Sequence, residues 1–471
     1  MDQKTFKKWN RTVGLAVLVI SALTYLSTIE PTASFWDCGE FIASSYKLEV
    51  GHPPGNPVFQ LFARFFTIPV DAQHAAVAVN AMNAILSALT IFLLYFTIVF
   101  FARRVVVGSP VRPGMTDTSV TAGSDRLSVG RAIAIFASGA VGALAYCFSD
   151  TFWFSAVEGE VYAMSSFFTA LVFWAMCRWY EQADEPHANR WIVLITFLMG
   201  LSIGVHLLNL LTIPAFVFMY YYRKNPDKKL SFKQLAGIFG IGVVIEFLLV
   251  YLFIPYFPKL AAWFDRIFVN GFGLPYNTGA LFFLVGVLVL CFWGLFTSLK
   301  RGKVFLNTVL LCVTTLVTGF SLFSIVIIRS SVKTPTNEYQ PDNPYTLVRY
   351  LSREQYGSTP LLYGQYYGAP YEIKSGSYWA PLNGKYVKAS APADAVYSPE
   401  GKMLFPRMWS NADQRYIDFY QEYTHGKGTR IRGTQHRKPS FGANLAYFFD
   451  YQLNWMYWRY FMWNFVGRQN E

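Results

Sequence analysis

Long apolar stretches alternate with short polar connections over residues 1–328. A bilayer core about 30 Å thick is crossed by about 20 apolar residues in a helix. The stretch Trp191–Tyr222 is too long for one crossing and polar residues interrupt it near His206, so we expect two short spans joined by a tight turn. The pattern therefore predicts about nine transmembrane helices, at Val13–Ile29, Ala75–Phe101, Ala132–Phe148, Val161–Met176, Trp191–Tyr222 (two), Leu235–Ile254, Gly279–Ser298 and Val304–Ile328.

Lys and Arg are divided unequally between the two sets of connections. The set that includes the N-terminus carries 19, whereas the other set carries 4. Connections on the cytoplasmic side of membrane proteins are enriched in these residues. We therefore expect a cytoplasmic N-terminus, and nine crossings then place the residues after the last span on the exoplasmic side.

The composition changes after the last predicted span. Residues 329–444 are rich in Pro, Gly, Asn, Tyr and charge, which predicts an exoplasmic (periplasmic) domain of α+β or irregular structure following a transmembrane domain at 1–328. Residues 445–471 combine many Trp and Tyr with Asp450 and Arg459. Such aromatic residues favour the headgroup level of a bilayer, so we expect an interfacial segment here rather than a tenth span.

Overall composition supports a membrane protein and excludes other classes. The chain is 53% hydrophobic and 14% charged, unlike a soluble or a disordered protein. Its net charge of +12 comes from the membrane-flanking connections and the predicted exoplasmic domain, so no nucleic-acid partner is expected. The five cysteines form no CxxC pair, which argues against a disulfide framework or a zinc site.

The first predicted exoplasmic connection holds the most informative polar residues. Asp37 and Glu40 are three positions apart, hence on one face of a helix, and lie among aromatic residues at the membrane surface. Such a setting can raise the pKa of a carboxyl group and suits a general base. The alternative is that these acids only solvate the loop or cap a helix. The rigid sequence after them, with His52 followed by Pro53, Pro54 and Gly55, favours a site.

Other polar groups are predicted to face the same compartment. Glu158 and Glu160 repeat the acidic and aromatic theme in the second exoplasmic connection. His206 and Asn209 lie at membrane depth, where polar side chains are unfavourable unless they serve a cavity, although a His there is also commonly a packing residue. His52 with Arg64, or Arg329, could bind an anion such as a lipid phosphate, and the alternative for each Arg is ordinary contact with the membrane interface.

Several long motifs, in order, carry a resemblance to a known family. They are SFWDCGEFIASSYKLEVGHPPGNPVFQLFARFF, AVEGEVYAMSSFF, GLSIGVHLLNLLTIPA and LLYGQYYGAPY. Together they resemble a bacterial membrane-protein family of formerly unknown function, related to the transmembrane protein O-mannosyltransferases of the GT-C glycosyltransferase superfamily. The resemblance implies an all-α, GT-C-like polytopic membrane protein in the bacterial cytoplasmic (inner) membrane.

The resemblance also implies an activity and a set of roles. A sugar would move, with inversion, from a polyprenyl-phosphate carrier to a hydroxyl of a protein or glycan acceptor. Asp37 would act as base with Glu40 beside it, and Glu158 and Glu160 would contribute. The donor phosphate would be bound by His52, Arg64, His206 and Asn209. No cofactor and no metal ligands are firmly expected beyond the lipid-linked sugar donor, and a divalent cation could take part.

Two other readings fit the same pattern. Nine apolar spans with polar residues at membrane depth are also typical of a transporter or flippase, but here the acids lie in connecting loops and no inverted repeat is visible. A noncatalytic membrane scaffold in an envelope assembly could bind a protein partner through the aromatic C-terminal region. A scaffold predicts that substitutions in the acidic loops have no effect.

Overall fold

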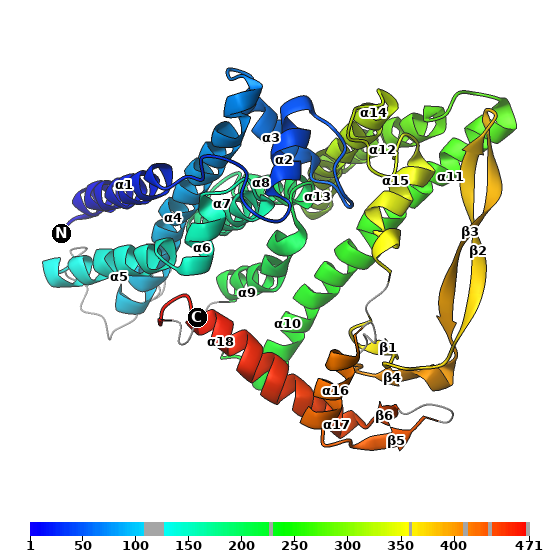
Figure 1. Ribbon diagram of the computed structural model, residues 1–471. Coiled ribbons are helices and arrows are strands. Elements are labelled where there is room, and N and C mark those ends of the chain that lie inside the picture. The colour runs from blue at the N-terminus through cyan, green and yellow to red at the C-terminus, as the bar shows by residue number, and fades with distance from the viewer. Residues whose placement is uncertain (108–126, 226–228, 358–359, 408–412, 432–435, 468–471) are drawn as a thin grey trace. The chain divides into compact units, whose positions relative to one another are not determined.

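The computed structural model describes residues 1–471 except 108–126, 226–228, 358–359, 408–412, 432–435 and 468–471. Part of the connection between the predicted spans Ala75–Phe101 and Ala132–Phe148 lies outside the described residues. The chain forms two compact units, Met1–Ser352 and Arg353–Glu471. Figure 1 shows that helices make up the first unit, whereas the strands belong to the second.

The first unit is a bundle of apolar helices, as the sequence predicts. Among the described residues, seven helical segments are long and apolar enough to cross a membrane. Each overlaps a predicted span, which confirms an all-α polytopic membrane protein. The segments are Gln3–Ser27 (α1), Ala72–Val107 (η1 and α4), Val129–Cys147 (α5), Val161–Gln182 (α7), Phe232–Phe272 (α10, η3 and α11), Thr278–Lys300 (α12) and Val304–Ser331 (α13, η4 and α14).

The stretch at Trp191–Tyr222 folds as two short helices. Helix α8 (Arg190–Ile203) and helix α9 (Ile213–Lys224) are joined by the 3-10 turn η2 (Leu207–Thr212). Helix α8 ends with Gly204 as its C-cap, and His206, which has an extended backbone, accepts a hydrogen bond from the backbone N–H of Leu208 and so caps the start of η2. The interruption is confirmed, and both helices are shorter than the seven full-length segments of the described chain, which accounts for the difference from nine.

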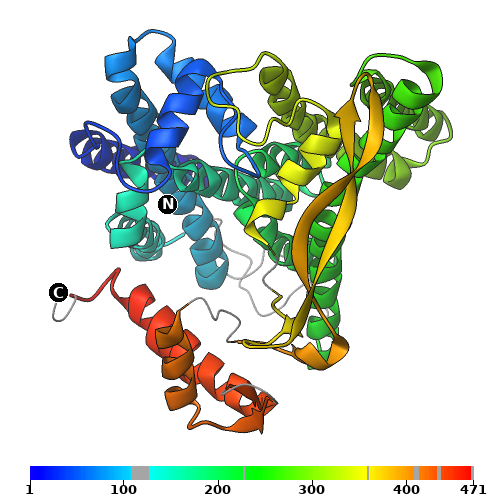
Figure 2. The same cartoon turned by 45° about the vertical axis from the view of Figure 1, so that its right-hand side comes forward.

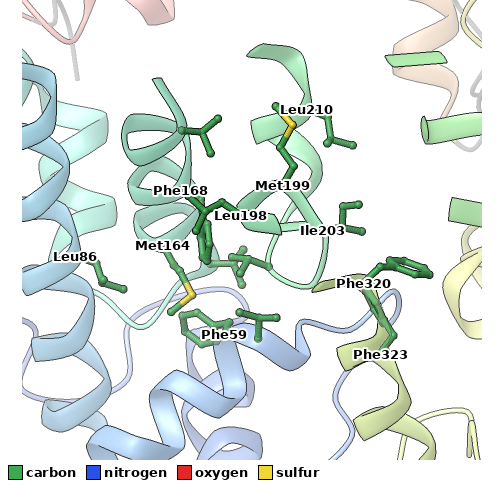
Figure 3. Close-up of a cluster of buried hydrophobic side chains, with 14 of the residues drawn as sticks. Phe59, Leu86, Met164, Phe168, Leu198, Met199, Ile203, Leu210, Phe320 and Phe323 are labelled. Atoms are coloured by element: carbon green, nitrogen blue, oxygen red, sulfur yellow. The ribbon is translucent and has the colours of Figure 1, made fainter. Parts of the chain in front are cut away.

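Close packing of helices buries the apolar core of the first unit. Figure 3 shows part of one cluster, in which Phe59 of helix α3 (Pro57–Thr67) meets Met164 and Phe168 of α7. Helices α8 and α13 approach closely at two glycines. A Cβ atom on Gly200 would lie 2.4 Å from the backbone oxygen of Leu316, and Gly319 is equally restricted by α8. Small residues permit such contacts between membrane helices, where dispersion replaces the hydrophobic effect.

Residues 329–352 belong to the first compact unit. Helix α15 (Pro344–Leu351) packs against α11 and α14. The side-chain amide of Asn277 donates a hydrogen bond to the backbone oxygen of Asp342 at 3.1 Å. The compact unit therefore extends beyond the boundary at 328 that composition predicts. The predicted functional division into 1–328, 329–444 and 445–471 stays a prediction.

The second unit contains three two-stranded antiparallel sheets and several helices. The sheets pair β1 (Tyr363–Gln365) with β4 (Lys402–Leu404), β2 (Tyr371–Leu382) with β3 (Lys385–Tyr397), and β5 (Gly428–Arg430) with β6 (Arg437–Pro439). Figure 2 shows the β2–β3 hairpin as a long twisted ribbon. Asn383 and Gly384 turn it with φ values of 47° and 78°, a conformation that these residue types accept readily.

Tyrosine side chains form the core of the second unit beside its helices. Tyr367, Tyr420 and Tyr447 are buried together, and Tyr420 belongs to helix α16 (Gln414–Tyr423). The predicted interfacial segment continues as helix from α17 (Phe441–Ala446) through η7 (Tyr447–Trp458) and α18 (Arg459–Met462). Its last residues, 468–471, lie outside the described chain, and its place at a membrane surface stays a prediction.

Candidate functional site

The first loop, residues 28–74, places Asp37 immediately before helix α2 (Cys38–Lys47). The carboxylate makes no hydrogen bond to the first turn of α2, so it does not act as a helix cap. Its side chain is 57% exposed, and Oδ2 lies 3.8 Å from Nε2 of His52. Asp37 is therefore accessible to another molecule while it faces a histidine.

Glu40 and His52 form a paired polar contact within the first loop. The Glu40 carboxylate lies 3.0 Å from Nδ1 of His52 and also accepts the His52 backbone N–H at 2.6 Å. Burial disfavours the charged form of Glu40, but these hydrogen bonds outweigh burial and lower its pKa. The expectation of a raised pKa is therefore wrong for Glu40, because the sequence did not show that His52 pairs with it. The same contact raises the pKa of His52.

The second loop, residues 148–160, supplies two buried carboxyl groups. Glu158 and Glu160 are 5% and 7% exposed. Burial raises the pKa of both, and the nearby charges of Asp37 and Glu158 add to this effect on Glu160, whose pKa rises to about 7. A raised pKa is thus found in the second loop, and Glu160 can gain or lose a proton near neutral pH.

The buried thiol of Cys38 connects the two loops. Its Sγ lies 3.6 Å from Oε2 of Glu158 and 3.8 Å from Oε1 of Glu160. Burial and the two carboxylates raise the pKa of the thiol, so Cys38 stays protonated and donates to them. Because Cys38 adjoins Asp37, this contact brings the acids of both loops together.

Two asparagines of α4 hold the backbones of both loops. Asn83 donates to the backbone oxygens of Glu158 and Glu160, each at 2.6 Å. Asn80, one turn earlier, donates to the backbone oxygens of Glu30 and Thr32 at 2.6 and 3.0 Å. Sequence reasoning missed both residues, although two Asn spaced three apart in an apolar span were a usable signal.

Asn83→Leu is expected to lower the free energy of unfolding by about 1–3 kcal/mol, because buried carbonyl groups lose their donor while the side-chain size is nearly kept. Thermal unfolding of the purified protein in nanodiscs measures the change. Ser87→Ala is the matched control, because Ser87 is buried on the same helix and its hydroxyl has no hydrogen-bond partner among the described residues. Equal losses in both variants would show that Asn83 does not hold the second loop.

The predicted phosphate-binding arginines contact the C-terminus of α2. Arg64 donates to the backbone oxygen of Tyr46 and lies over its ring at 5.3 Å. Arg329 donates to the backbone oxygens of Leu48 and Lys47 at 2.6 and 3.0 Å. Free carbonyl groups and the negative end of the helix dipole favour cations at this position. Both side chains therefore position α2, and phosphate binding by Arg64 stays a prediction.

The two polar residues of the α8–α9 interruption differ in their surroundings. The His206 ring packs against the ring of Tyr162, near the start of α7 and so close in the chain to Glu160. Asn209 is fully buried and donates to Oγ of Ser202 at 3.0 Å, and its binding of phosphate stays a prediction. His206 thus lies at the same end of the bundle as the second loop.

No group of three His, Cys, Asp or Glu side chains in the described part of the chain could hold a metal ion. The polar groups of the site are carboxyl groups, the imidazole ring of His52 and the thiol of Cys38. Asp37, Glu40 and His52 form one cluster, and Glu158 and Glu160 join it through Cys38.

Comparison with known proteins agrees with the resemblance seen in the sequence. Residues 37–229 match the family described as the protein O-mannosyl-transferase TMEM260 N-terminal domain. The chain is related to the transmembrane protein O-mannosyltransferases. The matched segment starts at Asp37 and contains every predicted site residue through Asn209. Residues 357–449, in the second compact unit, match a family of unknown function (DUF8416).

Two curated relatives extend the match. Protein O-mannosyl-transferase TMEM260 of Mus musculus is 23% identical over 266 residues, which cover 55% of this chain and 33% of the relative. The Dictyostelium discoideum protein of the same name is 23% identical over 241 residues, covering 48% of this chain and 26% of the relative. The match therefore spans about a third and a quarter of the length of these relatives.

Proposed function

We propose that the chain is a membrane glycosyltransferase that moves a sugar from a polyprenyl-phosphate carrier to a hydroxyl of a protein or glycan acceptor, with inversion. The main supporting observation is the contact between the two loops, in which the thiol of Cys38, next to Asp37 in the first loop, meets Glu158 and Glu160 of the second loop. The relatives are named as protein O-mannosyl-transferases, which makes mannose and a Ser or Thr hydroxyl the first pair to test.

Asp37 is the proposed general base. The acceptor oxygen attacks the anomeric carbon of the sugar, the bond from that carbon to the carrier phosphate breaks, and the acceptor proton passes to the Asp37 carboxylate. The exposed face of Asp37 admits an acceptor, and the His52 ring lies 3.8 Å from its carboxylate on the other side.

Glu160 is the second candidate for proton transfer. Its pKa of about 7 suits a group that must both accept and release a proton near neutral pH. Because the side chain is 7% exposed, Glu160 reaches a substrate less directly than Asp37 does. Variants at the two positions therefore distinguish the base from a buried proton carrier.

The donor is proposed to bind where the loops meet the bilayer. The prenyl chain stays in lipid while the phosphosugar reaches the carboxylates, so binding fixes the reacting atoms relative to each other. His52, Arg64, His206 and Asn209 remain the proposed phosphate contacts. The distribution of Lys and Arg supports an exoplasmic site. The resemblance in the sequence implies that this is the periplasmic side of a bacterial inner membrane. A divalent cation could assist the departing phosphate.

Transfer of radiolabelled mannose tests the proposal. The purified chain in nanodiscs would receive polyprenyl-phosphate [¹⁴C]mannose and a peptide that contains Ser and Thr, and the expected result is a labelled peptide of inverted anomeric configuration. Substituting other lipid-linked sugars and a glycan acceptor extends the test. Movement of the labelled carrier between leaflets without any covalent product would instead support a flippase.

A further inference from the structure

The segment that follows the last span lies alongside the first loop. Val50 and Asn337 form a parallel β-bridge. The Val50 amide donates to the backbone oxygen of Thr336 at 3.1 Å, and the Glu338 amide donates to the backbone oxygen of Val50 at 3.1 Å. These two bonds fix the register between the strands, so Glu338 is held beside the residues that lead into His52.

Helix α15 holds the other side of the same loop. The buried hydroxyl of Tyr350 donates to the backbone oxygen of Gly51 at 2.6 Å and lies 3.2 Å from that of His52. Gly55 has a φ of 75°, and a Cβ atom there would lie 2.8 Å from the Tyr350 hydroxyl oxygen. The His52 loop is therefore held at two points by the segment that follows the last span.

Three carboxylates act on the His52 ring. Glu40 contacts Nδ1 from helix α2, and Asp37 faces Nε2 from the residue before that helix. Glu338 acts from the segment after the last span, and its negative charge adds to those of Glu40 and Asp37 in raising the pKa of His52. Partial burial and the charge of Glu40 raise the pKa of Glu338 itself.

We propose that Glu338 is a positioning residue of the candidate site: the bridge to Val50 holds it beside the His52 loop, where with Glu40 and Asp37 it orients the His52 ring. Glu338 lies outside the segment 37–229 that matches the transferase family. Its consequence for catalysis rests on the proposed function, whereas its effect on the charge of His52 does not. A His52 ring held in this way keeps Nε2 directed at the Asp37 carboxylate, the proposed base.

Chemical modification of His52 at a series of pH values tests the proposal. Diethyl pyrocarbonate reacts with neutral imidazole, 23% of the His52 side chain is exposed, and peptide mass spectrometry reports each histidine separately. In Glu338→Gln the pH midpoint of His52 modification should move to lower pH, because a negative charge that stabilises the imidazolium is removed. His74, which pairs with Asp71 at 2.6 Å, is the internal control and should keep its midpoint.

Further variants separate charge from structure. Glu40→Gln should shift the His52 midpoint further than Glu338→Gln does, because its contact is direct. Glu338→Asp keeps the charge and should return the midpoint towards that of the wild type. An unchanged His52 midpoint in Glu338→Gln would overturn the proposal, whatever the transfer assay shows. If transfer occurs, the alkaline limb of its pH profile should move to lower pH in the same variant.

Discussion

Asp37→Asn is expected to slow sugar transfer by about 10²- to 10⁴-fold, the usual contribution of a positioned general base. The amide keeps the size of the side chain but cannot take a proton from the acceptor. Folding should be maintained, because the carboxylate is half exposed and does not cap α2. Initial rates of label transfer in nanodiscs, at equal amounts of folded protein, measure the effect.

Asp71→Asn is the matched control for the base. Asp71 belongs to the same loop, is 66% exposed and also lies next to a histidine, His74. The control should transfer sugar at the wild-type rate. Full activity in Asp37→Asn would exclude Asp37 as the base and make Glu160 the next residue to test.

Glu160→Gln is expected to change how stability depends on pH. The folded state raises the pKa of Glu160 from about 4.5 to about 7, so this group contributes its full stability below about pH 4.5. That contribution is lost as the pH rises through 7, a decrease on the order of 3 kcal/mol in the free energy of unfolding. Gln cannot ionise, so the variant should gain stability relative to the wild type across this range. Thermal unfolding at a series of pH values measures the difference.

The control for Glu160 is an exposed acid of the same compact unit. Glu185→Gln removes one carboxylate from the surface, and its stability relative to the wild type should hardly vary with pH. If Glu160→Gln behaved in the same way, the pKa of Glu160 would be equal in the folded and the unfolded chain, and burial would not raise it.

Hydropathy predicted the helices well because each span must satisfy its backbone and bury apolar surface within one segment. The interruption near His206 could also be predicted from the sequence, because a polar residue and a following proline act locally on the helix. The sequence pattern could not predict that residues 329–352 belong to the first compact unit. Their membership depends on contacts such as that between Asn277 and Asp342, which are distant in sequence.

The site was only partly predictable for the same reason. Acidic residues in two loops were visible as a pattern, but which of them would have a raised pKa depends on the neighbours that folding supplies. The hydrogen bonds from His52 lower the pKa of Glu40, whereas burial dominates at Glu160 and raises its pKa. Glu338 and Cys38 gave no local signal, because their importance comes only from what lies opposite them.

The two arginines at the end of α2 bear on how the protein can be shortened. Arg64 precedes the other by more than half of the chain, yet both donate to carbonyl groups of the same helix terminus. A fragment trimmed to the family match at 37–229 would lose Arg329, the strand beside Val50 and the Tyr350 hydroxyl together. Such a fragment would therefore contain α2 without these contacts, whereas the compact unit that includes them extends to Ser352.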